Sequence, residues 1–380
     1  MYDSLVSVID ELYGTSRPVS LHEPQLGLRE RSYVNQALDS GFISSVGQMV
    51  DWFEKEFAKI VGAKHAISTA NGTAALHVAL LLAGVGKGDE VISQSLTFVA
   101  TCNAITYCGA VPTFVDISPD TLGISASGLR DFLQSCCDID ADGHCRNRLT
   151  GRRVSACVPM HTFGISSDII EIVKLCDEYN IPVVEDAAEA VGSYHADKHL
   201  GTFGLVSAFS FNGNKIVTAG GGGAVVTNDA ALARRAKHLT TTARIADGFE
   251  FTHNEVGFNY RMTNLNAAVG IAQLEQLDEF VQRKRRVHDV YAAWGRSNGF
   301  QIIDEPKGTK SNYWLNVLVA NSKQERDEIL EFTNENGVHC RPVWTPMHQL
   351  AIHGAHEGFD LPMTEYYFDR VVNLPSSPVG

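Results

Sequence analysis

Lys215 is the side chain of this sequence with the clearest potential for covalent chemistry. It follows the apolar, strand-like stretch 209–211 and precedes four consecutive glycines at 220–223. A lysine held in such a dense, apolar setting gives up its proton more readily and becomes a nucleophilic amine that can condense with an aldehyde. The plainer interpretation is a lysine whose stem covers apolar surface while its amine stays in water.

Two further features could assist such an amine. Asp186 ends the apolar stretch 181–185, and α/β proteins place ligands at the carboxyl ends of their strands. Residues 71–75 (Asn-Gly-Thr-Ala-Ala) predict the end of a strand and the start of a helix, whose free N–H groups can hold a phosphate. Taken singly, the first is typical of an aspartate that caps the next helix, and the second of an ordinary helix cap.

These features form a chemically specific set when they are taken together. A helix N-terminus for a phosphate, a carboxylate that keeps a ring nitrogen protonated and a lysine for an aldehyde are what a protein contributes to pyridoxal phosphate chemistry. The protonated ring then serves as an electron sink, which lowers the barrier to removing a proton from the attached carbon. Phe98, early in an expected helix, could stack on the ring or could simply pack in the core.

The elements that must position these groups alternate between helix and strand from about residue 50, which predicts an α/β sheet. Phe53, Phe57 and Ile60 recur at helical spacing and predict a helix over 50–60. The other expected helices are 74–83, 100–107, 167–180 and 229–239, and the expected strands are 65–70, 89–93, 111–117, 154–160, 181–185, 206–211 and 223–227.

The character of the chain changes after about residue 265. Residues 264–294 predict one long helix, and its basic run 283–286 is interpreted as a solvated helix face. Shorter strand-like pieces such as 313–319 and a proline-containing tail follow. The sequence therefore predicts a large domain over 1–265, with a mostly parallel mixed sheet, and a smaller α+β domain over 266–380, on which the N-terminal segment could pack.

Composition narrows the possible functions. The chain has 380 residues, 44% of them hydrophobic, and a net charge of −13, which disfavours nucleic acid and anionic membranes as partners. The chain shows no export signal and no unbroken apolar stretch near the roughly 18 residues that a membrane span needs. Its eight scattered cysteines form no CxxC pair, so we expect a cytoplasmic protein with reduced thiols.

No metal site is predicted. Residues 138–143 resemble the opening of a calcium loop, but its twelfth position is Leu149 rather than a glutamate. The cysteines near His144 fit no standard zinc spacing. The chain also lacks GxGxxG after its first strand, which disfavours a nicotinamide-dependent dehydrogenase or dehydratase.

Several ordered motifs can be compared with known families: SGFI at 40–43, GAKHA at 62–66, NGTAAL at 71–76, TFVA at 97–100, EDAAEA at 185–190, SFNGNK at 210–215, GFNYRM at 257–262 and RP at 341–342. In these motifs the chain resembles the DegT/DnrJ/EryC1/StrS family of sugar aminotransferases over nearly its whole length. The resemblance implies an aspartate aminotransferase-like (type I) fold that uses pyridoxal 5'-phosphate, with pyridoxamine 5'-phosphate as an intermediate.

The resemblance also implies roles around the cofactor ring. Lys215 would bind the cofactor covalently and later move a proton, Asp186 would pair with the ring nitrogen, and Phe98 would cover one ring face. Glu189 stands where the family usually has Gln and would lie against the other face. The presence of Lys215 disfavours the dehydratases of the family, in which a histidine replaces the lysine.

Further roles implied by the resemblance concern the phosphate. Thr73, Ala74 and Ser210 would bind it within one chain. Asn259 would reach it from a neighbouring subunit, which implies a homodimer with shared active sites. Asn212 replaces the histidine of many members and leaves the detailed contacts open.

Residues 211–223 and 341–348 resemble a subgroup that aminates C4 of nucleotide-linked 4-keto-6-deoxy-N-acetylhexosamines on routes to bacillosamine or legionaminic acid. The expected reaction is a ping-pong transfer from L-glutamate to such a UDP- or GDP-linked sugar. The alternatives are amination of another carbon, such as C3, and a non-catalytic regulatory protein of the same fold. The nucleotide stays open, as does whether His161, His348 or Arg341 touches the sugar.

Overall fold

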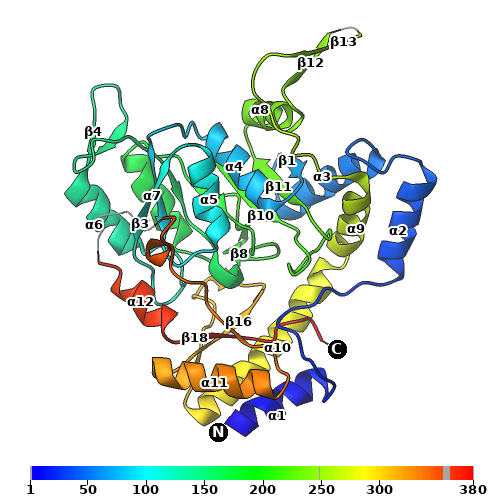
Figure 1. Ribbon diagram of the computed structural model, residues 1–380, viewed down its shortest axis with the longest axis vertical. Helices are drawn as coiled ribbons and strands as arrows, with labels where there is room; N and C mark the ends of the chain where they lie inside the picture. The colour runs from blue at the N-terminus through cyan, green and yellow to red at the C-terminus, as the bar shows by residue number, and fades with distance from the viewer. Residues whose placement is uncertain (1, 248, 354–359, 380) are drawn as a thin grey trace.

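The computed structural model describes residues 2–247, 249–353 and 360–379, and a mixed sheet lies at its centre (Figure 1). A three-stranded and a four-stranded sheet join through bridges from Cys157 to Val183 and from Met160 to Asp186. The resulting order is β3 (Val111–Val115), β2 (Glu90–Gln94), β6 (Val154–Val158), β7 (Val184–Asp186), β10 (Val206–Ser210), β11 (Gly223–Thr227) and β1 (His65–Thr69).

In this central sheet, β11 runs against its neighbours. It pairs antiparallel with β1 and β10, whereas the pairs from β3 through β10 are parallel. The other strands therefore end at one common edge, where the segments that follow them meet. The predicted α/β class with a mostly parallel mixed sheet is confirmed.

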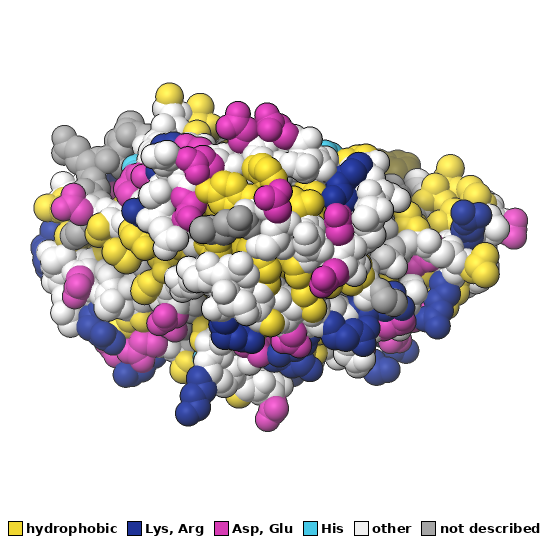
Figure 2. Space-filling view, turned by 90° about the horizontal axis from the view of Figure 1, so that it is seen from below, with side chains coloured by type: hydrophobic (Ala, Val, Ile, Leu, Met, Phe, Trp, Pro, Cys, Tyr) yellow, Lys and Arg dark blue, Asp and Glu magenta, His cyan; other side chains and the backbone are white. Residues whose placement is uncertain are grey.

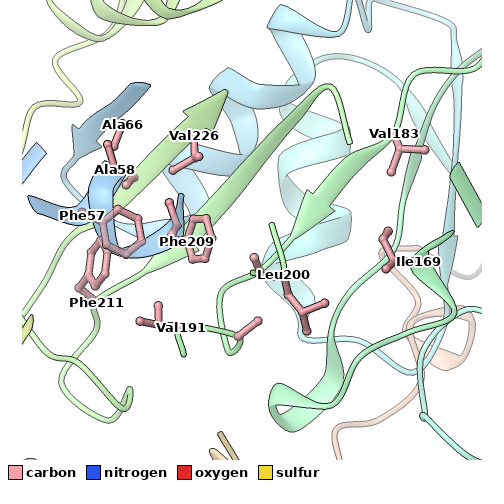
Figure 3. Packing of buried hydrophobic residues seen from close by; sticks show 14 of the residues in the cluster. Phe57, Ala58, Ala66, Ile169, Val183, Val191, Leu200, Phe209, Phe211 and Val226 are labelled. Carbon is pink, nitrogen blue, oxygen red and sulfur yellow. The ribbon is translucent and has the colours of Figure 1, made fainter. Parts of the chain in front are cut away.

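Helices cover both faces of the sheet. In β10, Ala208 belongs to the core under α4 (Gly72–Leu82), α5 (Val99–Tyr107) and α8 (Ala230–Thr240). Its neighbour Phe209 points to the other face, whose core includes α3 (Gln48–Val61), α6 (Ala126–Cys136), α7 (Ile169–Glu178) and α9 (Asn264–Leu274). There Phe57 packs edge-on against Phe209 and Phe211, at centroid distances of 5.0 and 4.9 Å (Figure 3).

A second, antiparallel sheet lies below the first (Figure 1) and has the order β14 (Gln301–Ile302), β16 (Asn316–Val319), β18 (Val371–Leu374) and β17 (Arg341–Pro342). α10 (Leu277–Asn298), α11 (Lys323–Glu335) and the N-terminal α1 (Tyr2–Tyr13) pack with it. Leu5 and Ile9 share this core with Tyr291 and Leu318. The domain boundary predicted between residues 265 and 266 falls inside α9, which packs on α2 and α3, and it stays a prediction.

The remaining elements lie outside the two main sheets and the helices named above. They are α2 (Leu28–Asp39), α12 (Pro362–Phe368), β4 (Cys137–Ile139), β5 (Cys145–Asn147), β8 (Tyr194–His195), β9 (Lys198–His199), β15 (Thr309–Lys310), and the short helices Thr162–Gly164 and Met347–Gln349. A hairpin of β12 (Arg244–Asp247) and β13 (Glu250–His253) projects away from the body (Figure 1). Its Phe251 is 74% exposed, so the hairpin presents apolar surface to solvent.

The predicted single helix over 264–294 is wrong, because α9 and α10 are separate helices. Gln276 leaves helical geometry at φ −109° and ψ 1°. Its side-chain Nε2 donates to the carbonyl of Ala272 at 2.7 Å and to Oε1 of Glu30 at 2.8 Å. No glycine or proline marks this break, so the apolar periodicity does not reveal it.

The interpretation of residues 283–286 as a solvated helix face is wrong for Lys284, which is fully buried. Its Nζ donates to the carbonyl oxygens of Trp314 and Ser376. Burial holds the pKa of Lys284 well below its usual value. This side chain therefore ties α10 to the start of β16 and to the C-terminal tail.

The surface carries charges of both signs, and the cysteine thiols are buried. On the face seen from below α1 and α11, the basic side chains are interspersed with acidic ones (Figure 2). All eight cysteines are buried and free. Among the described residues, none of the helices combines the length and the apolarity that crossing a membrane requires.

Gly223 offers a test of how closely β11 approaches the start of α4. A Cβ there would lie 2.5 Å from the carbonyl oxygen of Asn71, which is backbone and cannot move aside. We expect Gly223→Ala to lower the free energy of unfolding by about 2 kcal/mol, measured by chemical denaturation. Gly86→Ala is the matched control, because its nearest contact would be 3.8 Å away. Equal stabilities of the two variants would contradict the close approach.

Candidate active site

A cavity of about 330 Å³ opens where the segments following the central strands meet. It is lined by six of the residues that the sequence predicts for the site: Thr73, Phe98, Asp186, Glu189, Ser210 and Lys215. They come from the start of α4, the start of α5, the end of β7 and the turn after it, and the end of β10 and the loop that follows. The fold thus brings together side chains that are far apart in the sequence.

One end of the cavity suits an anion. A Cβ on Gly72 would lie 2.7 Å from that of Ser210, so glycine allows α4 to begin directly beside β10. The Asn71 side chain caps the helix by accepting the N–H of Ala74 at 2.8 Å, and Ala74 itself does not line the cavity. Within the described residues, the N–H groups of Gly72 and Thr73 have no acceptor. Free N–H groups at a helix N-terminus are suited to a phosphate.

Asp186 supplies a buried carboxylate to the same cavity. Its Oδ2 accepts a hydrogen bond from the Thr101 hydroxyl at 2.8 Å, and its Oδ1 accepts one from the N–H of Ala188 at 3.2 Å. Burial raises the pKa of Asp186, while the Thr101 bond and the charge of Lys215 oppose the rise. A carboxylate held in this way is suited to pairing with a protonated ring nitrogen. No motif in the sequence points to Thr101.

The amine of Lys215 lies inside the cavity. Its Nζ is 3.1 Å from Oε1 of Glu189 and 3.8 Å from the centre of the Trp314 ring. Burial raises the pKa of Glu189 to about 7, against the opposing effect of Lys215 and of the Phe163 N–H bond. The side chain of Lys215 is only 13% exposed, which does not fit a lysine whose amine stays in water.

Two tryptophans complete the walls of the cavity, and sequence reasoning missed both. Trp314 donates its Nε1–H to the carbonyl of Asn214 at 2.7 Å. The Trp344 ring lies 6.0 Å from that of Phe98 and 5.2 Å from that of Phe163. Both come from the C-terminal part of the chain, and no local spacing signals that they reach the central sheet. They supply flat apolar surface beside the polar groups.

Asn259, which the resemblance places at the phosphate of a neighbouring subunit, does not line the cavity of its own chain. It is exposed and forms an isolated bridge with Thr241, next to the base of the β12–β13 hairpin. The structure describes one chain, so the assignment of Asn259 stays a prediction.

The other polar candidates have partners elsewhere. The Nε2 of His161 bonds Glu185 at 3.0 Å, and that of His348 bonds Glu365 at 2.7 Å. Arg341 donates to Oδ1 of Asn334 at 2.6 Å. None of His161, His348 and Arg341 lines the cavity. No group of three or more His, Cys, Asp or Glu side chains in the described part of the chain is arranged to hold a metal ion.

Glu185 fixes the end of β7 from the opposite side of the strand. Its Oε1 accepts the backbone N–H groups of Phe203 and Gly204 at 2.6 and 2.7 Å. Its Oε2 accepts the backbone N–H of Gly201 at 2.7 Å and the ring Nε2–H of His161 at 3.0 Å. Burial disfavours the charged form, but the bonds from His161 and the loop outweigh it, so the pKa of Glu185 is lowered. Its neighbour Asp186 is therefore held at one position.

A lysine amine, a buried carboxylate and a helix N-terminus around one cavity are the groups that a protein contributes to pyridoxal phosphate chemistry. Comparison with known families agrees with this chemistry. The model of the DegT/DnrJ/EryC1/StrS aminotransferase family matches residues 24–379, and the chain therefore belongs to this family.

Individual relatives match over most of their length. The chain is 37% identical to a GDP-perosamine synthase of Vibrio cholerae, covering 95% of this chain and 94% of that protein. It is 38% identical to the putative pyridoxal phosphate-dependent aminotransferase EpsN of Bacillus subtilis (strain 168), covering 95% and 91%. Among solved structures, DesI in the presence of its TDP-sugar product superposes with a TM-score of 0.82 at 30% identity, covering 95% and 88%.

Glu185→Gln tests the carboxylate that fixes β7. The amide nitrogen of Gln would face N–H donors, so we expect the free energy of unfolding to fall by about 3 kcal/mol, measured by urea denaturation. Glu171→Gln is the matched control, because Glu171 forms exposed ion pairs with Arg130 and Lys174 and should cost less than about 1 kcal/mol. If both variants unfold alike, Glu185 does not fix the strand.

Proposed function

We propose that this aminotransferase moves an amino group from L-glutamate to C4 of a UDP- or GDP-linked 4-keto-6-deoxy-N-acetylhexosamine by a ping-pong mechanism. The observation that carries the proposal is the meeting of the Lys215 amine, the Asp186 carboxylate and the free N–H groups of α4 in one cavity. One relative is described as a GDP-perosamine synthase, and the related DesI was solved in the presence of its TDP-sugar product. Both descriptions support a nucleotide-linked sugar as the acceptor.

The residues of the cavity would have separate roles in this reaction. Pyridoxal phosphate, when bound, supplies an electron sink that lets a proton leave the carbon next to the amino nitrogen. Asp186 would keep the ring nitrogen protonated, and Phe98 and Glu189 would flank the ring. Lys215 would hold and move the proton at its Nζ, because its amine is the base that reaches into the cavity.

The phosphate would be held at the start of α4. Thr73 and Ser210 offer hydroxyl groups, and the N–H groups of Gly72 and Thr73 point their dipoles toward the same end of the helix. Ala74 donates its N–H to the side chain of Asn71, so it would give the phosphate no hydrogen bond of its own. Its small side chain would leave room for the phosphate at the start of the helix.

Two copies of the chain share their sites in this proposal. Asn259 lies exposed beside a projecting hairpin whose Phe251 is 74% exposed. Burying this apolar surface against a second copy would stabilise a homodimer and carry Asn259 toward the phosphate of the partner site.

A substrate panel tests the proposed reaction. The holoenzyme is incubated with L-glutamate and each of several UDP- and GDP-linked 4-keto sugars, and the products are identified by mass spectrometry and NMR. We expect a 4-amino sugar and 2-oxoglutarate in equal amounts with at least one member. Amination at C3 would overturn the regiochemistry, and no turnover with any member would overturn the sugar substrate.

Lys215→Ala tests the catalytic amine. We expect turnover to fall by roughly 10³-fold, because the base that carries the proton is lost. Borohydride reduction should attach the cofactor covalently to the wild type at Lys215 and to no residue of the variant, as read by peptide mass spectrometry. Lys174→Ala, an exposed lysine on α7, is the control and should behave as the wild type. A normal cofactor adduct in Lys215→Ala would contradict the assignment.

A further inference from the structure

The Lys215 amine has two partners that suit a positive charge, and they come from distant parts of the chain. Oε1 of Glu189, in the turn after β7, lies 3.1 Å from Nζ. The face of Trp314, just before β16, lies 3.8 Å from the same atom. A carboxylate and an indole face both stabilise an ammonium group, the second through the negative charge density of the ring.

Both partners are held in place independently of the lysine. Oε2 of Glu189 accepts the N–H of Phe163 at 2.8 Å, and the carbonyl of Glu189 accepts Nδ2 of Asn312 at 2.8 Å. The N–H of Trp314 donates to Oδ1 of Asn312 at 2.8 Å, and its Nε1–H donates to the carbonyl of Asn214. Asn312 therefore fixes Glu189 and Trp314 relative to each other, so the position between them is preformed.

The backbone of Trp314 accepts a further hydrogen bond. The carbonyl of Trp314 accepts Nζ of the buried Lys284 at 3.0 Å. Because burial lowers the pKa of Lys284, its amine can hold this backbone carbonyl without the cost of an unpaired buried charge. This hydrogen bond fixes the backbone of Trp314, and with it the position of the indole ring beside the Lys215 amine.

Two carboxylates and no second cation surround the amine among the described lining residues of the cavity. Asp186 is the second carboxylate that lines the cavity, and Lys215 is the one basic side chain among its described lining residues. Burial raises the pKa of Glu189 to about 7, and the charge of Lys215 opposes this rise. The two groups stabilise each other in the charged state.

An aminotransferase needs a place for a free lysine, and this step rests on the proposed function of Lys215. With pyridoxal phosphate bound, the donor nitrogen would replace the Lys215 nitrogen on the cofactor, and Lys215 would leave as the neutral amine that acts as the base. Over the whole half-reaction, the donor ammonium and the water that releases the keto acid would supply the protons that finally make the free lysine an ammonium. No oxidant or reductant is required, and the lysine remains free while the amino group resides on the cofactor.

We propose that Glu189 and Trp314 form a resting site for the free, protonated amine of Lys215, and that this resting site stabilises the enzyme form in which the cofactor carries the amino group. The resting site adds to the ring contact that the resemblance implies for Glu189, and it gives Trp314 a role as a positioning residue. It also gives a role to the carboxylate at position 189, where the family usually has Gln, because only a carboxylate supplies a negative charge to the ammonium of Lys215.

The first test measures the half-reaction equilibrium. The holoenzyme is titrated with mixtures of L-glutamate and 2-oxoglutarate, and the ratio that converts half of the cofactor is read from its absorption spectrum. We expect Glu189→Gln to need a glutamate ratio about tenfold higher than the wild type, because a charged hydrogen bond to the free amine is lost. Trp314→Leu should shift the ratio about fivefold in the same direction. Glu171→Gln should leave it unchanged.

The second test uses the protein without cofactor, so it does not depend on the reaction. Lys215 is acetylated with limiting acetic anhydride at neutral pH, and its labelling is quantified by peptide mass spectrometry against exposed lysines of the same chain. We expect Glu189→Gln and Trp314→Leu to raise the labelling of Lys215 relative to these lysines, because the ammonium loses stabilisation. Glu171→Gln should again match the wild type.

The two tests separate this inference from the proposed function. If the wild type responds to glutamate while neither variant changes the midpoint or the labelling, the resting site is wrong and the aminotransferase function stands. If glutamate leaves the spectrum of the wild type unchanged, the proposed function fails, whatever the labelling shows. Trp314→Leu keeps the inference testable if Glu189→Gln does not fold, since the two variants remove separate partners.

Discussion

The buried carboxylate of Glu185 is the interaction on which the site depends most. Four N–H donors surround it in the interior: three come from the loop after β9, and the fourth is the ring of His161, in the segment that follows β6. Successive residues of a strand face opposite sides, so fixing Glu185 on one side also fixes Asp186 on the other. The buried charge of Glu185, which would be costly without partners, is thereby held rigidly and fixes the strand end that lines the cavity.

The two parts of the chain also depend on each other through polar contacts. Asn312 donates to the carbonyl groups of Glu189 and Val191 at 2.8 Å each. A Cβ on Gly164 would lie 1.9 Å from Oδ1 of Asn312, so the glycine leaves room for this side chain. The contact places Trp314 over the edge of the central sheet. Two lining residues of the cavity, Trp314 and Trp344, therefore come from the part of the chain that builds the smaller sheet.

Much of the large sheet follows from the sequence, because its strands are short apolar runs and its helices have regular apolar spacing. Lys215, Asp186 and Thr73 could be predicted to meet, since each lies at or shortly after the end of a strand on one edge of a mostly parallel sheet. Trp314 and Trp344 could not, because nothing near them in the sequence encodes a contact with the distant sheet. The break at Gln276 was hidden for a related reason, since a side-chain hydrogen bond interrupts the helix there without a glycine or proline.

The reversed direction of β11 has a consequence for how the chemistry can change between related chains. Because β11 starts at the edge where β10 ends, residues 211–222 never leave that edge, whereas a parallel strand would require a crossover of about a dozen residues or more to the opposite edge. One residue inserted before Lys215 would displace its amine by up to about 3.3 Å along the chain, which exceeds the tolerance of a hydrogen bond. The strands on either side would remain paired. Loop length is therefore a variable by which descendants of this fold can lose the covalent chemistry while they keep the same sheet.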